Sequence, residues 1–138
     1  MKSNYIVSTL LASFLLTGIV SFQATAAEEY VVKAQKQLLH KAPLAGAEGK
    51  EMTVVHFAFP PGFVSAKHIH PGPVFVYVLE GEFTVDVDGV TQTIKAGELY
   101  PEKLNAAMVA KNLSSTDNLE VLVFQVGTIG KPMMLKAD

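Results

Sequence analysis

Short hydrophobic segments that end at turn residues recur along this chain, and they constrain its fold more than any other feature. β-Branched and aromatic residues dominate these segments, which occupy residues 52–59, 74–79, 83–87, 90–94 and 119–126. Pro-Pro-Gly, Glu-Gly and Asp-Gly sequences follow the first three. Turns spaced about eight to twelve residues apart are typical of sandwiches and barrels. The sequence therefore predicts an all-β fold, with no helix after residue 40.

Other segments are less regular. Residues 31–39 fit either a short helix or a strand, residues 41–50 predict a loop rich in Pro and Gly, and residues 106–110 predict a short strand. Segment 74–79 does not alternate between apolar and polar residues, so we expect both of its faces to be covered. Segment 83–87 does alternate, which predicts that one of its faces meets water.

The N-terminus has the order of a secretory signal peptide. Lys2 precedes an apolar stretch over residues 6–20, and small residues follow, ending in Ala24-Thr25-Ala26-Ala27. The alternative is an uncleaved membrane anchor, but the stretch is shorter than the roughly 20 residues that span a bilayer. We therefore predict a signal peptide over residues 1–26 and one folded domain over residues 27–138, in a periplasmic or secreted protein that leaves the membrane after cleavage.

Composition excludes several classes of function. Lysine supplies all 11 basic residues against 13 acidic ones, and the lysines are scattered singly, which argues against nucleic acid as a partner. Cysteine is absent, so disulfides, thiolate metal sites and thiol catalysis are excluded together. The sequence also has no glycine-rich phosphate loop and no serine nucleophile in a recognisable setting.

Two histidines stand one residue apart in the stretch KHIHPGPVFVYVLEG, at His68 and His70. Residues i and i+2 of a strand point to the same face, so the two imidazoles should project together while Ile69 faces away. Two imidazoles in one interior space are costly to desolvate unless something pairs with them. The pair therefore predicts a bound metal, a bound ligand or an ordered polar network.

This stretch resembles the first motif of the cupin superfamily, G-x5-H-x-H-x3,4-E-x6-G, with Gly62, His68, His70 and Gly81 at the family spacing. The second motif, G-x5-P-x-G-x2-H-x3-N, aligns without a gap from Gly97 to Asn112. The resemblance implies a single-domain cupin β-barrel, that is, a double-stranded β-helix or jelly roll. It also implies a homodimer, because many cupins pair.

Departures from both motifs bear on function. The resemblance implies a metal site made of two histidines and a glutamate from the first motif and one histidine from the second. Val74 stands at the glutamate position and Met108 at the second-motif histidine, while Lys103 and Asn105 replace the motif's proline and glycine. Two of the four ligands are therefore missing.

The remaining donors still permit a metal site. A thioether is a soft ligand that suits Cu(I), so His68, His70 and Met108 form a candidate set, although methionine is more often a core filler. Copper, zinc, nickel, iron and manganese all stay open. Glu98 and Glu102 flank the second motif and could each supply a carboxylate at the mouth of the barrel, although the family spacing places neither of them in the metal shell.

Two functions follow from these residues. The first is an exported cupin that binds a metal ion or a small molecule through His68 and His70 without turning it over. The alternative is a metal-dependent cupin enzyme, an oxygenase or isomerase acting on a small organic molecule. The loss of two ligands harms catalysis more than it harms binding, so the sequence favours the first. Three further residues have simpler predicted roles. We expect His40 to be solvated, His56 to be a half-exposed histidine on a strand, and Asn112 to tie a turn through side-chain hydrogen bonds.

Overall fold

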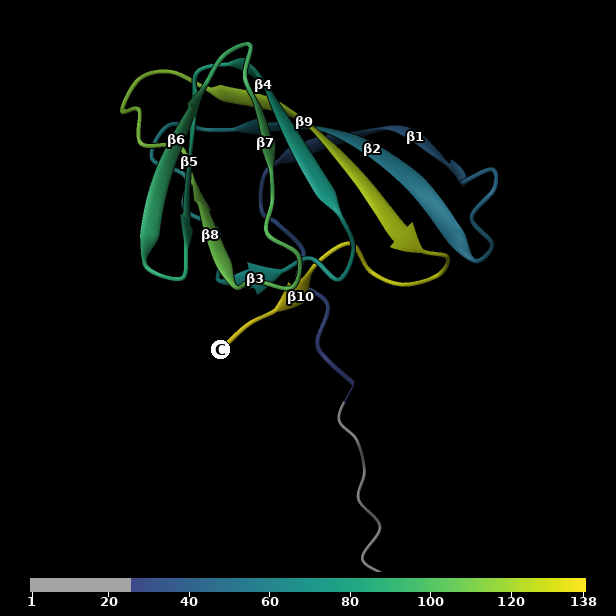
Figure 1. Cartoon of the computed structure of the whole chain (residues 1–138). Helices are drawn as coiled ribbons and strands as arrows, with labels where there is room; N and C mark the ends of the chain where they lie inside the picture. Colours follow the sequence, from purple (N-terminus) through teal and green to yellow (C-terminus); the bar gives the residue numbers. More distant parts are fainter. Residues whose placement is uncertain (1–25) are drawn as a thin grey trace, which may run out of the picture.

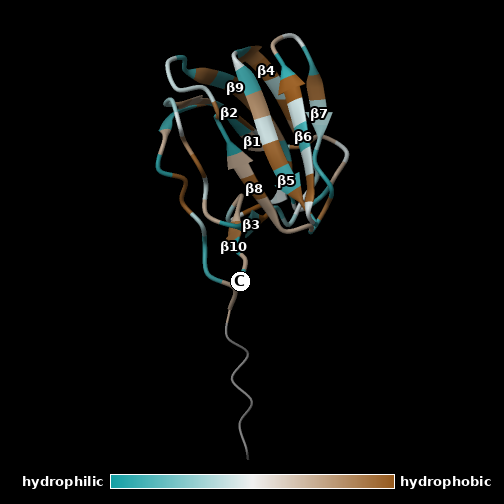
Figure 2. Ribbon diagram, turned by 90° about the vertical axis from the view of Figure 1, so that its left-hand side faces the viewer, coloured by the Kyte–Doolittle hydropathy of each residue, from teal (hydrophilic) through white to brown (hydrophobic). Residues whose placement is uncertain are grey.

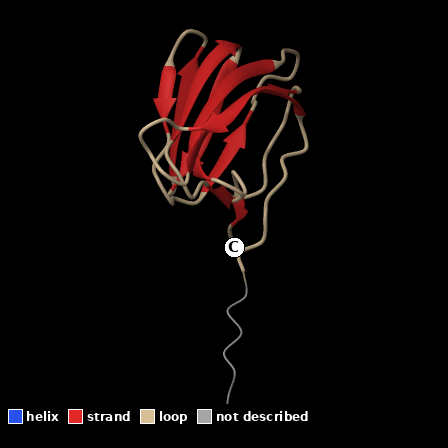
Figure 3. Cartoon of the chain, turned by 90° about the vertical axis from the view of Figure 1, so that its right-hand side faces the viewer, coloured by secondary structure: helices blue, strands red, loops and turns tan. Residues whose placement is uncertain are grey.

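The computed structural model describes residues 26–138 of the chain. The predicted signal peptide therefore lies outside the described residues, apart from Ala26. Every regular element of the described part is a strand, and Figure 3 shows no helix there. It follows that the described part contains no apolar helix long enough to cross a bilayer.

Ten strands build two antiparallel five-stranded sheets that face each other (Figure 1). One sheet has the order β1-β2-β9-β4-β7 and the other β10-β3-β8-β5-β6. This is the predicted all-β jelly roll. The strands are β1 (Gln35–Pro43), β2 (Lys50–Phe59), β3 (His68–Ile69), β4 (Val74–Glu80), β5 (Glu82–Val87), β6 (Val90–Lys95), β7 (Leu99–Pro101), β8 (Met108–Lys111), β9 (Leu119–Thr128) and β10 (Leu135–Lys136).

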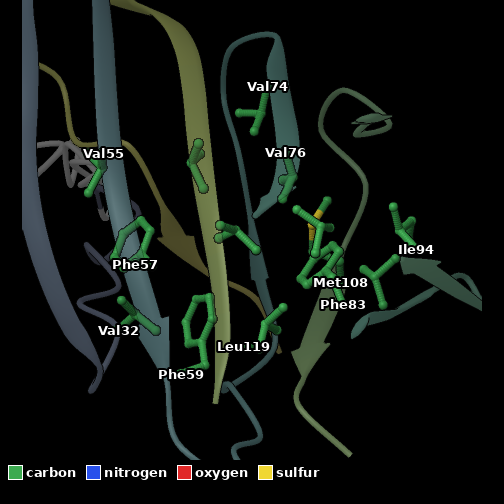
Figure 4. Packing of buried hydrophobic residues seen from close by; sticks show 14 of the residues in the cluster. Val32, Val55, Phe57, Phe59, Val74, Val76, Phe83, Ile94, Met108 and Leu119 are labelled. Carbon is green, nitrogen blue, oxygen red and sulfur yellow. The ribbon is translucent and has the colours of Figure 1, made fainter. Parts of the chain in front are cut away.

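The core lies between the two sheets and is made of aliphatic and aromatic side chains from both (Figure 4). Alternate residues of β2 and β9 point inward, as the burial of every second residue along both strands demonstrates. Figure 2 shows hydrophobic and hydrophilic residues in bands along the strands, the pattern that this alternation produces. The inward face therefore supplies both the packing that holds the fold and the walls of any interior site.

Two expectations about the first sheet were wrong. Residues 41–43 belong to β1 and not to a loop, because their backbone pairs with Glu51–Thr53 of β2. In β4 only Val74, Val76 and Val78 are buried, whereas Phe75 and Leu79 on the outer face are 42% and 44% exposed. Although β4 is apolar on both faces, the single chain covers only its inner face.

Candidate functional site

His68 and His70 lie at one end of the barrel, where β3 crosses between β8 and β10. Both side chains are buried, at 4% and 5% exposure, while Ile69 between them is half-buried. The ring centroids are 5.2 Å apart and the ring planes meet at 76°. The two imidazoles thus share one interior space, as their i, i+2 spacing predicts.

A backbone carbonyl holds Nδ1 of each imidazole. Nδ1 of His68 lies 2.9 Å from the carbonyl oxygen of Ala66, and Nδ1 of His70 lies 3.0 Å from that of Met133. A carbonyl oxygen only accepts hydrogen bonds, so Nδ1 is the nitrogen that carries the proton in each ring. The Nε2 atom of each neutral ring is therefore left with a free lone pair.

Burial favours the neutral form of both rings. It lowers the pKa of His68, and it lowers the pKa of His70 to about 4, with the neighbouring His68 acting in the same direction. Both imidazoles are accordingly uncharged at neutral pH. The neutral ring with a free Nε2 is the form that can bind a metal ion or accept a proton.

Further contacts fix the orientation of the two rings. Tyr30 stacks on His68 with ring centroids 5.1 Å apart, and its hydroxyl accepts a hydrogen bond from the backbone N–H of Ala66. The side-chain amide of Gln125 donates to the same Met133 carbonyl that holds His70. Contacts of this kind around a histidine ligand set its tautomer and direction.

Glu102, directly after β7, is the third polar group of the site. Its side chain is 6% exposed, and Oε2 lies 3.3 Å from Nε2 of His70. Among the described residues, this buried oxygen has no partner in hydrogen-bond geometry. Burial raises the pKa of Glu102 to about 7, so the carboxyl group exchanges its proton near neutral pH.

The position of Glu102 follows from the pairing of β4 with β7. Phe75 lies opposite Pro101 in this pair, and the backbone N–H of Glu102 donates to the carbonyl of Val74 at 3.0 Å. Val74 occupies the glutamate position of the first motif. Glu102 therefore brings a carboxyl group to the place of the missing one, from the adjacent strand. Glu102 thus lies where the sequence allowed it to supply a carboxyl group, although the family spacing alone does not make it a ligand.

A cavity of about 40 Å³ lies against these groups. His68, His70 and Glu102 are its polar lining residues, and the rest of the wall is apolar, including Met133 and Met134 from the segment between β9 and β10. Such a volume holds an ion together with a water molecule or two. It is well below the volumes of about 300–1,000 Å³ that are usual for drug-sized ligands.

Met108 occupies a different position from the other candidate ligands. It lies opposite His68 in the pairing of β3 with β8, and it is 1% exposed. Figure 4 shows it within the hydrophobic cluster, and it is not one of the described residues that line the cavity. The methionines that line the cavity are Met133 and Met134, neither of which stands at a motif position.

Comparison with known proteins agrees with this architecture. The profile of the Cupin domain matches residues 55–124, which is half of the chain. The chain belongs to the cupin family. Its matched region includes β3, β4 and β7, and so it contains His68, His70 and Glu102.

Solved structures with the same fold share little sequence with this cupin. A cupin 2 domain-containing protein from Halorhodospira halophila has a TM-score of 0.61 at 18% identity, over 75% of this chain and 68% of that one. A protein with a double-stranded beta-helix domain from Klebsiella pneumoniae has a TM-score of 0.59 at 17% identity, over 83% and 90%. Identities this low establish the fold alone.

Enzymes are among the matched structures. The DMSP lyase DddQ from Ruegeria pomeroyi has a TM-score of 0.59 at 15% identity, over 75% of this chain. This cupin spans about half of the lyase, 51% of its length. A search among curated proteins gave no match. The comparisons therefore do not transfer a reaction to this cupin.

The donor groups fit a metal ion in part. Across residues 26–138, no three His, Cys, Asp or Glu side chains are arranged to hold an ion together. The Nε2 atoms of two neutral imidazoles and the unpaired Oε2 of Glu102 are nevertheless the kinds of donor that a metal ion attracts. Two thioethers on the same wall extend the set with soft donors. This combination fits a soft ion, which needs fewer nitrogen and oxygen ligands.

The other candidate residues that the sequence indicated lie away from the cavity. His40 is exposed on β1, and Nε2 of His56 lies 3.1 Å from Oε2 of Glu120 on the outer face of the sheet. Glu98 accepts a hydrogen bond from the backbone N–H of Lys95 in a turn. The Asn112 side chain bonds four backbone groups, which confirms that it ties a turn: the carbonyls of Phe59, Pro60 and Asp117 and the N–H of Ser114.

Proposed function

We propose that this cupin binds one transition metal ion in the barrel cavity through Nε2 of His68 and Nε2 of His70, and holds it without turning over a substrate. One observation carries the proposal. Both imidazoles are buried with Nδ1 tied to a backbone carbonyl, which directs the free lone pairs of two neutral rings to one small cavity. Histidine ligands in metal sites are commonly held in this way.

The size of the cavity favours an ion over an organic ligand. About 40 Å³ accommodates an ion and a water molecule, whereas pockets for drug-sized ligands have volumes of about 300–1,000 Å³. The unpaired carboxyl oxygen of Glu102 supports the same conclusion, because a buried polar atom without a partner is destabilising. A bound cation would give this oxygen a partner.

The donor set favours copper in the Cu(I) state. Two imidazoles with thioethers nearby suit a soft ion, and Met133 and Met134 supply the thioethers on the cavity wall. Met108 remains the candidate that the sequence alone favours. We propose further that the protein acts after export, which the order of residues in segment 1–26 supports.

The test is metal content. Mature protein purified without a chelating tag should retain one copper ion per chain after loading and dialysis, measured by elemental mass spectrometry beside zinc, nickel, iron and manganese. The double variant His68→Ala with His70→Ala should lose the ion, and the matched control His40→Ala should keep it. Equal retention in the double variant would overturn the proposal. A near-native melting curve for that variant would establish that loss of metal is not loss of fold.

The second candidate function is an enzyme, and the contact between His70 and Glu102 favours it. A carboxyl group whose pKa is about 7 can donate or accept a proton at neutral pH, as general acid–base catalysis requires. Turnover of a small phenol or keto acid by the metal-loaded protein, lost in Glu102→Gln, would replace binding with catalysis. A panel of such compounds without turnover would leave binding as the function.

A further inference from the structure

A second, larger cavity adjoins the metal site. It has a volume of about 680 Å³, within the range of about 300–1,000 Å³ that is usual for small-molecule sites. The inner face of β1 and β2 forms one wall, and residues 130–134 and 29–31 form the other. Figure 1 shows the β1–β2 pair extending past the second sheet, above the segment that returns from β9 to β10.

The floor and sides of this cavity are apolar. Val55 and Phe57 of β2 lie at its base, and Leu38 of β1 stands opposite Val55 in the strand register. Leu38 and Val31 are 59% and 57% exposed. Large apolar side chains that line a cavity and still face solvent gain stability when an apolar ligand covers them.

Three lysines surround the apolar surface: Lys36, Lys41 and Lys131. Lys41 forms a salt bridge with Glu51 at 3.2 Å, whereas Lys36 and Lys131 form no salt bridge within residues 26–138. Glu29 is the acidic residue of the lining. The lining therefore carries an excess of positive charge.

A β-bulge brings two of these lysines to one face. The register of β1 against β2 shifts between Leu38 and His40, so Lys36 pairs with Phe57 while Lys41 pairs with Thr53. Phe57 and Thr53 are both inward-facing residues of β2. Without the extra residue, an odd separation of five would put the two lysines on opposite faces. The bulge thus directs both ammonium groups to the cavity.

We propose that the larger cavity binds an organic anion that has an apolar body and one carboxylate. The body would cover Leu38, Val55 and Phe57, and the carboxylate would lie near Lys36 and Lys131. Lys41 is neutralised by Glu51, so Lys36 and Lys131 remain, and Glu29 lowers their net charge to about +1, which suits a single carboxylate. The inference does not rest on the metal proposal, since none of these groups is a candidate metal ligand.

The two cavities share part of their walls. Phe57, Met133 and Met134 line both, and the carbonyl of Met133 accepts the hydrogen bond from His70. A ligand in the larger cavity would therefore touch the segment that orients His70. This contact offers a second readout, because binding should shift the NMR signal of the His70 ring.

The experiment is a pair of calorimetric titrations of the mature protein, with sodium decanoate and with decan-1-ol, its neutral counterpart. Decanoate should bind one per chain and at least about tenfold more tightly than the alcohol, as charge-assisted hydrogen bonds of ordinary strength imply. Lys36→Gln with Lys131→Gln should remove that difference. Lys33→Gln with Lys95→Gln, which removes the same charge from exposed positions outside the lining, should keep it.

Three results would overturn the proposal: no binding of decanoate, equal affinity for acid and alcohol, or an equal loss in both double variants. The same titrations on metal-free His68→Ala with His70→Ala separate the two proposals. Decanoate affinity should be unchanged in that variant. If the variant loses the metal but still binds decanoate, both proposals stand. If it also loses decanoate binding, the larger cavity does not bind its ligand independently of the two histidines.

Discussion

Glu102 lies beside Val74 in the pairing of β4 with β7, and it gives this cupin a carboxyl group at the cavity although the first motif lacks its glutamate. Antiparallel pairing of β4 with β7 directs residues 74 and 102 to the same inward face. A carboxyl group on either residue reaches the same space. Under the proposed function, Glu102 would therefore supply the carboxyl group that the first motif lacks, from the neighbouring strand.

The pH dependence of stability should reveal the buried carboxyl group. The pKa of Glu102 rises from an ordinary 4.5 to about 7 in the folded protein, so its contribution to stability is present below pH 4.5 and is lost as pH rises through 7. The pKa of His70 falls from 6.5 to about 4, so its contribution is lost as pH falls from 6.5 to 4. The two effects oppose each other between pH 4.5 and 6.5.

Glu102→Gln should remove one of these opposing effects. The metal-free variant and parent are unfolded with urea in the presence of a chelator at pH 4, 6 and 8. The difference between their free energies of unfolding should increase as pH rises. Relative to the parent, the variant should gain about 3 kcal/mol in free energy of unfolding between pH 4 and 8. This is the free energy that corresponds to a pKa change from 4.5 to about 7. A difference that stays constant across this range would mean that Glu102 is not buried in the folded protein.

Three methionine substitutions distinguish the thioethers. Met133→Leu or Met134→Leu should weaken Cu(I) binding in competition with a chromogenic chelator, because a thioether on the cavity wall is lost. Met108→Leu, a swap of similar volume in the core, should change stability by less than about 1.5 kcal/mol and leave the affinity unchanged. If only Met108→Leu weakens Cu(I) binding, Met108 is the thioether ligand, as the sequence allowed.

At the scale of elements, the strands that alternate or end at clear turns were placed well along the sequence, but the expectation that the second face of segment 83–87 meets water was wrong at Thr84, which is 2% exposed. Segments 52–59, 83–87 and 119–126 correspond to β2, β5 and β9, and the Asp88-Gly89 turn takes the positive φ angles of a tight hairpin. The strands β3, β7 and β10 have two or three residues each, too few for a periodic pattern. They exist because partners distant in sequence pair with them, and for that reason the sequence could name Glu102 only as one of two possible carboxyl groups, whereas the shared space of His68 and His70 follows from their local spacing.

The Pro71-Gly72-Pro73 turn between β3 and β4 packs directly on β9. A Cβ atom on Gly72 would lie 2.1 Å from the carbonyl oxygen of Val126, so Gly72→Ala forces the backbone apart. We expect a loss of about 2 kcal/mol or more in the free energy of unfolding, as overpacking commonly produces. The control is Gly127→Ala, whose Cβ would meet nothing within 4 Å. Equal stability of the two variants would contradict the close approach.

At the scale of the whole molecule, the outer face of the first sheet carries an apolar area over β4, β7 and the adjoining part of β9. Phe75 pairs with Phe124 there, Tyr77 pairs with Leu122 and with Leu99, and Leu99 is 56% exposed. We propose that two copies of the chain pair through this face, as the family resemblance implies. Covering it would also explain why β4 is apolar on both sides.

Light scattering with size-exclusion chromatography tests the dimer. The parent should have twice the mass of the chain, and Phe75→Lys should have the mass of one chain because it places a charge in the apolar face. Val90→Lys, at an exposed position on the other sheet, should remain a dimer. A monomeric parent, or a dimer that survives Phe75→Lys, would remove this face from the assembly.

The central claim is that one ion lies between two imidazoles inside the barrel. Anomalous diffraction from crystals of the copper-loaded protein, recorded at the copper absorption edge, tests it most directly. We expect one peak in the cavity, about 2 Å from Nε2 of both His68 and His70, the usual length of a metal–imidazole bond. Copper bound elsewhere on the protein with no peak in the cavity, or rings turned toward solvent, would contradict it.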